Sequence, residues 1–180
     1  MRKVVLYIAM SLDGYIADSN GGVSWLNGQD EENTDPGSYP EFIKTVDTVI
    51  LGYNTYHQVV TELSPDSWVY SGMKSYVVTS KNIESTDEII FTNVNLAQLI
   101  FTLKKEEGKD IWICGGASIA NQLLRLNLID EFYISVIPTI LGRGIRLFGE
   151  HNKEIKLELI NTKNYNGIVD LQYRCRKSIL

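Results

Sequence analysis

Two adjacent glycines, Gly115 and Gly116, follow an apolar run and precede Ala117 and Ser118. Glycines at the junction of a strand and a helix let the backbone approach a pyrophosphate, while the start of the helix offers N–H donors and positive potential. The segment matches neither GxGxxG nor GxxxxGK[ST], so the usual dinucleotide-binding and P-loop motifs are excluded. Binding of a dinucleotide and a tight structural turn are the two interpretations.

Three other segments place polar groups directly after apolar runs. Gly52 precedes Asn54 and Thr55, an arrangement that leaves free N–H groups at a helix start for a phosphate. Residues 79–81, Thr-Ser-Lys, combine two hydroxyls and a cation, which suit a ribose or a phosphomonoester. Asp13 lies in SLDGYIA, where its carboxylate either caps a turn or faces a substrate.

Other common kinds of site have no support in the sequence. The two histidines, His57 and His151, have no second His, Cys or acid at ligand spacing, so we expect no metal site. Cys114 and Cys175 form no CxxC pair, which favours a reducing, cytoplasmic setting. No serine lies in a GxSxG motif, so nucleophilic hydrolase chemistry is not indicated.

Composition limits the ligands that these segments can serve. The chain has 180 residues, of which 44% are apolar and 22% charged, and a formal net charge of −5. These values predict a single globular domain over residues 1–180. Nucleic acids and membrane surfaces require a cationic face, so we expect neither as a partner, and an anionic ligand must be bound locally. The acidic stretch over residues 27–38 predicts one long solvated loop.

Short apolar runs predict the strands that position these segments. Residues 4–10, 47–51, 75–79 and 110–114 are apolar without alternation, which is typical of strands covered on both faces by helices. Ligands of open α/β sheets bind beyond the carboxyl ends of the strands. We therefore expect the four polar segments to converge at one edge of a sheet.

Three helices are predicted between these strands. Ser38 and Glu41 form a capping-box pattern before a helix over residues 39–46. Asn95 precedes apolar residues spaced i, i+3, i+4 and i+7, which predicts a helix over residues 96–103. A third helix, after the paired glycines, is expected from the weaker stripe of Ile119, Leu123 and Leu126.

The last third of the chain predicts antiparallel structure. Asn166 and Gly167 tolerate the positive φ of a hairpin turn, and they separate predicted arms over residues 155–160 and 168–176. Alternation in the second arm puts Asp170 on its polar, solvated face. The expected sheet is therefore mixed, with parallel crossovers first and an antiparallel edge last.

The motifs resemble those of the dihydrofolate reductase-like family. They are SLDGYIA, ILGYNTY, VVTS, ICGGASIANQLL and LIDEFYISVIPTILGRGIRLF, and they cover nearly the whole chain. They are most similar to the reductase domain of bifunctional riboflavin-biosynthesis deaminase-reductases, although no deaminase zinc motif is present. The resemblance implies an α/β, three-layer fold around a mixed, mainly parallel sheet with a C-terminal antiparallel hairpin, and it implies NADPH as the cofactor.

The resemblance also implies roles for individual residues. Ala9 and Ile16 would contact the nicotinamide carboxamide, and Asp13 would be the carboxylate near the sugar being reduced. The dinucleotide contacts would come from Gly52, Asn54 and Thr55 at the phosphates, Thr79 and Ser80 at the adenosine ribose and its phosphate, and Gly115, Gly116, Ala117 and Ser118 at the pyrophosphate. The bond between the paired glycines is a cis peptide in the dihydrofolate reductase pattern.

Three departures from the family pattern concern specificity. Many members have Arg after the second-motif glycine to bind a 2′-phosphate, whereas this chain has Tyr53, and Lys81 is the alternative cation. The helix acid of a dihydrofolate reductase would fall on residues 36–38, where there is none. The acidic loop offers no partner for a phosphorylated sugar, which suggests a substrate without phosphate.

Together these features predict hydride transfer from a reduced nicotinamide to a C=N or C=O carbon of a small heterocyclic or sugar-linked substrate. Asp13 would be the catalytic polar partner, as a proton donor or relay, and Trp25 and Phe42 would line the substrate cleft. Trp25 is equally consistent with a core side chain. A dihydrofolate reductase is the alternative enzyme, and a non-catalytic nucleotide-binding sensor is the alternative of another class. We expect a homodimer formed through an exposed arm around residues 134–140.

Overall fold

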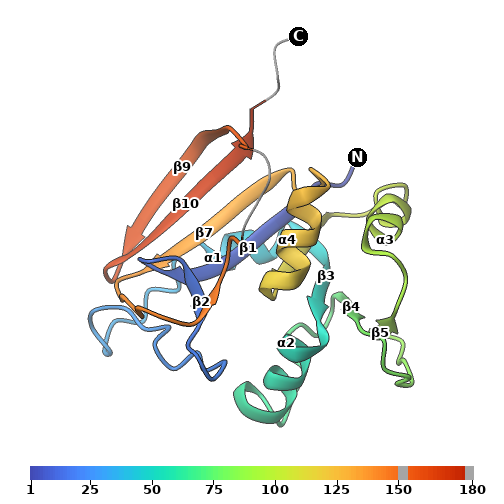
Figure 1. The fold of residues 1–180 in the computed structure, drawn as a ribbon, viewed down its shortest axis with the longest axis horizontal. Coiled ribbons are helices and arrows are strands. Elements are labelled where there is room, and N and C mark those ends of the chain that lie inside the picture. Colours follow the sequence, from blue (N-terminus) through green and yellow to red (C-terminus); the bar gives the residue numbers. More distant parts are fainter. Residues whose placement is uncertain (150–153, 177–180) are drawn as a thin grey trace.

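The chain folds into three layers, with one large sheet between two layers of helices (Figure 1). The structure is a computed structural model that describes residues 1–149 and 154–176, so His151 lies outside the described residues. The helices are α1 (Tyr39–Ile43), α2 (Tyr53–Gln58), α3 (Leu96–Leu103) and α4 (Ala117–Arg125), and a π-helical segment, η1 (Val59–Leu63), continues α2. The strands are β1 (Val4–Ser11), β2 (Tyr15–Ala17), β3 (Val46–Gly52), β4 (Lys74–Val78), β5 (Ile89–Thr92), β6 (Asp110–Gly115), β7 (Glu131–Ile137), β8 (Ile145–Arg146), β9 (Leu157–Tyr165) and β10 (Ile168–Cys175).

The large sheet is mixed and mainly parallel. Its strand order is β5-β4-β3-β6-β1-β7-β10-β9, and β2 pairs with β8 in a small separate ribbon. All neighbours from β5 to β7 are parallel, whereas β7, β10 and β9 are antiparallel to one another. The fold predicted from the resemblance is therefore confirmed, including the C-terminal hairpin. No sequence pattern predicted β2, β5 or β8, which are two to four residues long.

Both faces of the central strands are buried, as their apolar runs predict. On one face the sheet packs against α3 and α4, where Ile100 and Leu123 are fully buried. On the other face it packs against α1 and α2, and Phe42 and Trp112 lie in that second core. The four predicted central strands are all present, with ends that differ by at most one residue from the predicted ones.

The helix predictions were correct in position and partly wrong at the ends. Asn95 caps α3 as predicted, because its side chain accepts hydrogen bonds from the N–H groups of Ala97 and Gln98. The capping box before α1 is wrong: Ser38 makes no side-chain cap, since its own backbone is helical rather than extended. Helix α1 also ends at Ile43, three residues earlier than predicted, because the chain turns there into β3.

The third predicted helix, α4, begins directly after the paired glycines, and its apolar stripe is partly different from the predicted one. Ile119 and Leu123 are buried, but Leu126 is 51% exposed because the helix ends before it. Ala120 and Leu124 complete the buried face instead.

Of two expectations for the last third of the chain, one is wrong and the other is correct only in part. Asp170 is 6% exposed rather than solvated, because β9 and segment 27–38 cover its side of β10. The region around residues 134–140 is exposed only in its second half: β7 pairs with β1 on one side and β10 on the other and Ile134 is 5% exposed, whereas Ile140, after the strand, is 71% exposed. The first arm of the hairpin also lies slightly later than predicted, as β9.

The amino end of the chain is held by a buried cation. Arg2 is 6% exposed, and its Nε donates to the carbonyl oxygen of Lys109 at 2.6 Å. Its guanidinium also donates to the carboxylate of Asp47 and to Thr48 Oγ1. A buried charge is tolerated only when it is paired and hydrogen-bonded. Arg2 therefore ties the start of β1 to β3 and to the segment before β6.

Candidate active site

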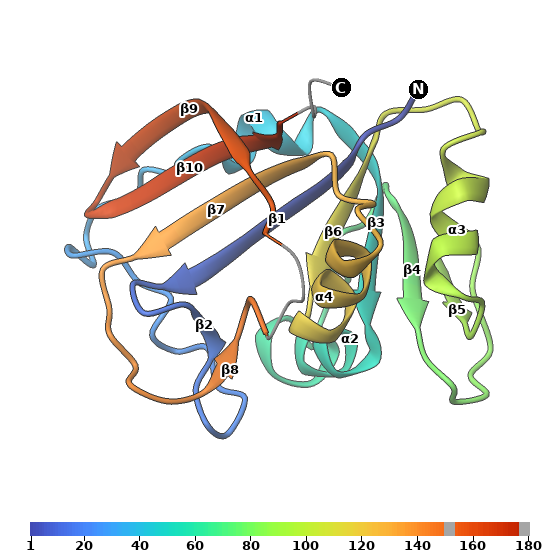
Figure 2. The same ribbon diagram turned by 45° about the horizontal axis from the view of Figure 1, so that its top comes forward.

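Gly52, which ends β3, and Gly116, which follows β6, meet at the carboxyl edge of the sheet, where Figure 2 shows the arrowheads of the parallel strands beside α2 and β2. A Cβ added to Gly116 would lie 3.4 Å from Thr55 Oγ1 and 4.0 Å from Ile16 Cδ1. A Cβ added to Gly52 would lie 3.9 Å from the backbone nitrogen of Gly116. Four predicted cofactor residues, distant in sequence, are thus brought together. The bond between Gly115 and Gly116 is cis.

The two helices at this edge begin without side-chain caps. Gly52 is the N-cap of α2 and Gly116 is the N-cap of α4, and both have extended backbones. A glycine cap cannot satisfy the first N–H groups of a helix, which are therefore free to bind an anion. Ala117 and Ser118 form the first turn of α4, and Asn54 and Thr55 lie in that of α2. These residues fit the phosphates of a dinucleotide.

A cation lies beside the position where many family members have Arg. The Nζ of Lys81 is 3.8 Å from the centre of the Tyr53 ring. The turn after β4 brings it there, and Thr79 Oγ1 accepts a hydrogen bond of 3.1 Å from the backbone N–H of Lys81. Ser80 and Lys81 are both exposed. The end of β4 thus presents two hydroxyls and a cation next to the start of α2.

Asp13 accepts three hydrogen bonds from its own turn and from the segment after β7. Ser11 Oγ donates to Oδ1 at 2.6 Å, the N–H of Leu141 donates to Oδ1 at 3.1 Å, and the N–H of Gly142 donates to Oδ2 at 2.7 Å. The bond from Ser11, together with the two backbone bonds, holds the pKa of Asp13 below its usual value, although partial desolvation opposes them. The carboxylate is therefore charged at neutral pH and can accept but not donate a proton in a hydrogen bond.

The segment that Asp13 holds, residues 138–147, crosses the end of β1; we call it the strap. The N–H of Leu12 donates to the carbonyl oxygen of Thr139 at 2.8 Å, and the N–H of Leu147 donates to that of Gly14 at 2.9 Å. β8 within the strap pairs with β2, which carries Ile16. Asp13 therefore caps a turn and fixes the strap beside a predicted nicotinamide contact. Its contact with a substrate stays a prediction.

The remaining predicted site residues differ in their accessibility. Ala9 is half-buried near the end of β1. Trp25 is also half-buried, and its Nε1 donates to the carbonyl oxygen of Gly22 at 3.2 Å. Phe42 is 3% exposed and packs edge-on against Tyr7, with 4.5 Å between ring centres. Phe42 is thus a core side chain, and its burial does not favour direct contact with substrate.

A buried carboxylate that the sequence pattern did not indicate, Asp170, lies at the same edge. Asp170 Oδ1 accepts from Ser135 Oγ at 2.6 Å and from the Tyr165 hydroxyl at 3.2 Å, and Oδ2 accepts from the N–H of Ser38 at 3.2 Å. Burial, and then the charge of Asp170, raise the pKa of Tyr165 to about 12 and raise that of Tyr7 as well. Ser135 is the one polar residue inside the apolar run FYISVI, and this was the signal that could have indicated a buried polar partner.

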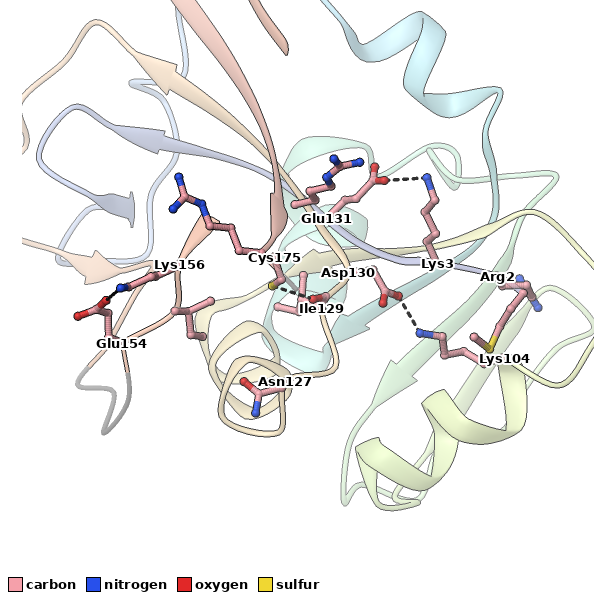
Figure 3. A pocket seen from close by; sticks show the side chains of 14 residues that line it. Arg2, Lys3, Lys104, Asn127, Ile129, Asp130, Glu131, Glu154, Lys156 and Cys175 are labelled. Carbon is pink, nitrogen blue, oxygen red and sulfur yellow. Dashed lines mark hydrogen bonds and ion pairs between the residues drawn. The ribbon is translucent and has the colours of Figure 1, made fainter. Parts of the chain in front are cut away.

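A groove of about 1100 Å³ lies at the opposite end of the sheet, between the amino ends of β1 and β7 (Figure 3). Its charges pair with one another, as in Lys3 with Glu131 and Lys104 with Asp130, both at 2.7 Å. It contains none of the glycine-capped helix starts. We therefore place the candidate active site at the carboxyl edge.

Within residues 1–149 and 154–176, no helix combines the length and apolar character needed to cross a bilayer. Among the same residues, no cluster of three or more His, Cys, Asp or Glu side chains is arranged to hold a metal ion.

The three-layer fold and the glycine-lined edge define a reductase-type domain of the dihydrofolate reductase-like superfamily. Residues 2–169 match the family model of the RibD C-terminal domain, so the chain belongs to this family. It is 43% identical to the uncharacterised protein YwjB of Bacillus subtilis strain 168 over 96% of this chain and 97% of YwjB. Identity to YyaP of the same strain is 32%, over 96% of this chain and 94% of YyaP.

Relatives whose names refer to riboflavin biosynthesis are more distant. The RibD protein of Haemophilus influenzae is 22% identical, over 81% of this chain and 50% of RibD. Among solved structures, a Shewanella sp. PV-4 protein whose name associates it with riboflavin biosynthesis is 28% identical, with a TM-score of 0.84 over 97% of this chain and 99% of that one. The Thermotoga maritima deaminase/reductase has a TM-score of 0.71 at 16% identity, over 97% of this chain and 57% of that one, and shows the shared fold.

Proposed function

We propose that this protein is an NADPH-dependent reductase that transfers hydride to a C=N or C=O carbon of a small heterocyclic or sugar-linked substrate, as 5-amino-6-(5-phosphoribosylamino)uracil reductase does. The convergence of Gly52, Thr55 and Gly116 with Ile16 at one edge carries the proposal. Membership of the RibD C-terminal domain family supports it, because reductases of this family use a nicotinamide cofactor.

The reduced nicotinamide supplies the hydride when the cofactor is bound. The free N–H groups at the starts of α2 and α4 would bind its phosphates, and Ala9 and Ile16 would orient its ring at the end of β1. Asp13 is charged, so it orients a donor group of the substrate rather than protonating it. By holding the strap, Asp13 also fixes β8 against β2, the strand that carries Ile16.

The position of Lys81 beside Tyr53 supports NADPH over NADH. Replacing Lys81 with Ala should raise the Kd of NADPH about tenfold, as expected for the loss of one charged contact to a phosphate, and leave that of NADH unchanged. Lys105→Ala is the matched control, since Lys105 is exposed in the connection between α3 and β6, before the amino end of β6. Fluorescence titration measures both constants. Equal effects on the two cofactors would contradict this assignment.

Turnover is tested by the loss of NADPH absorbance with a panel of substrates. Oxidation of NADPH with aminopyrimidine or sugar-linked substrates would support the proposal. Dihydrofolate-dependent oxidation with inhibition by antifolates would identify a folate reductase instead. Tight NADPH binding without oxidation by any pterin, pyrimidine or carbonyl compound would identify a nucleotide-binding sensor.

We also propose that the protein acts in the cytoplasm as a homodimer. Among the described residues β9 pairs only with β10, which leaves it as an edge strand, and Leu159 and Ile160 on it are 53% and 42% exposed. Long apolar edge strands are prone to pair with a second chain. Sedimentation as a monomer at micromolar concentration would contradict the homodimer.

A further inference from the structure

Four neighbouring strands each contribute one polar side chain to a buried network. Tyr7 of β1, Ser135 of β7, Asp170 of β10 and Tyr165 of β9 face one another, and the first three are at most 9% exposed. None of these four residues has a part in the proposed hydride transfer. Buried carboxylates are costly unless they are hydrogen-bonded, so the donors around Asp170 are a structural requirement.

The network begins next to the proposed nicotinamide site. In the register of the sheet, Ala9 lies opposite Ser135, and Ser135 lies opposite Asp170. Residues opposite one another point to the same face, and adjacent strands are about 4.8 Å apart. Asp170 is therefore roughly 10 Å from Ala9 across the sheet, on the face that carries α1.

Segment 27–38 is fastened to the hairpin along its length, contrary to the expectation of a freely solvated loop. The N–H of Gln29 donates to the carbonyl oxygen of Asn166 at 2.9 Å, and Lys163 Nζ donates to that of Gly37 at 2.8 Å. Its acidic side chains remain exposed, but its backbone follows the hairpin. A side chain on Gly37 would overlap the Tyr165 ring, so the two segments are in direct contact there.

Asp170 is the buried residue at which segment 27–38 and the hairpin are joined. Its three donors come from β7, from β9 and from the residue before α1. Only a carboxylate accepts hydrogen bonds at both of its oxygens without a donor of its own. An amide in its place would point an N–H group at one of these donors, so the segment would be held less firmly.

β1 divides the carboxyl edge into two sides. The proposed cofactor residues of β3, β4 and β6 lie on one side, and the network of β7, β10 and β9 lies on the other. A substrate must reach the nicotinamide at Ala9 from the side that the cofactor leaves open. That side is bordered by segment 27–38 and the residues before α1, which Asp170 holds.

We infer that Asp170 is a positioning residue for the substrate: by fixing Ser38 and segment 27–38 against the sheet, it sets substrate affinity and leaves cofactor affinity unchanged. This inference rests on the proposed function. Beyond the proposed function, the inference states that the C-terminal hairpin, rather than the first helix, forms the substrate side of the site.

The test replaces Asp170 with Asn, with Asp87→Asn as the control at an exposed acid. We expect Asp170→Asn to raise the substrate KM about tenfold and to change kcat less than about threefold, as the weakening of charged hydrogen bonds predicts. The Kd of NADPH should stay within about twofold. Tyr165→Phe removes one donor and keeps the charge, and should raise KM about threefold; it carries the test if Asp170→Asn does not fold.

Hydrogen exchange of segment 27–38, measured by mass spectrometry, gives a readout that needs no turnover. Exchange should become faster in Asp170→Asn and stay unchanged in Asp87→Asn. If NADPH is never oxidised, the proposed function fails while this exchange result still tests the attachment. Unchanged exchange, unchanged KM, or a rise in the Kd of NADPH equal to the rise in KM would overturn the inference.

Discussion

Asp13 and Asp170 are two carboxylates at the same edge of the sheet, and each accepts three hydrogen bonds. The donors of Asp13 are one hydroxyl and two N–H groups from its own turn and from the strap. Those of Asp170 are two hydroxyls and one N–H from three separate segments. Asp13 is partly exposed, whereas Asp170 is 6% exposed.

This difference separates two functions of a carboxylate. Asp13 lies where solvent or a substrate can still reach it, so its charge remains available for recognition. Asp170 is enclosed by its donors, so its charge acts on the protein itself. A count of hydrogen bonds would not distinguish the two residues, whereas their burial and the origin of their donors do.

The largest expected effect is on stability. Replacing Asp170 with Ala leaves one buried donor, Ser135, and two half-buried donors without an acceptor, and should lower the free energy of unfolding by about 3 kcal/mol. Asp13→Ala should lower the free energy of unfolding clearly less, because water can bind the N–H groups of the strap that lose their acceptor. Urea unfolding of both variants checks this, and an equal or larger loss in Asp13→Ala would remove the distinction.

The next effect is on turnover. Asp13→Asn should lower kcat about 100-fold, the scale of a positioned polar group in a reacting site, and should leave NADPH binding nearly intact. Asp170→Asn should act mainly on KM instead. Steady-state kinetics with the substrate found by the panel measures both. Near-normal turnover in Asp13→Asn would exclude its catalytic role.

The smallest effect is on the response to acid. The pKa of Asp13 in the folded protein is below its value in the unfolded chain, because Ser11 and the strap donate to the charged form. Its contribution to stability is therefore present above about pH 4 and is lost as the pH falls through the lower folded value. Asp13→Asn should flatten the decline in the free energy of unfolding between about pH 5 and pH 3. If the free energy of unfolding of Asp13→Asn declines with falling pH as steeply as that of the native protein, Asp13 is not the source of this pH dependence.

The sequence predicted those parts of the fold that depend on local patterns. Unbroken apolar runs identified the four central strands, and Asn95 identified the start of α3 because its cap is made within three residues. The capping box at Ser38 failed although the residue types were right. The N–H of Ser38 is instead taken by Asp170, 132 residues later, and a local pattern does not contain that partner.

The same limit applies to the candidate site. The edge formed by Gly52 and Gly116 was predictable, since Gly52 ends its strand and Gly116 directly follows its own. Asp170 was placed on a solvated face because alternation reports only that one side of a strand is polar. What covers that side depends on segment 27–38, whose attachment to the hairpin is long-range.

The buried Arg2 has a consequence for how the native protein opens. Chain ends usually fray, and their amides then exchange without unfolding of the remainder. Here the guanidinium joins the second residue to Asp47, Thr48 and Lys109 in the middle of the chain. The amino end can therefore detach only if that central part also opens, so the amides of β1 should exchange at the rate of global unfolding.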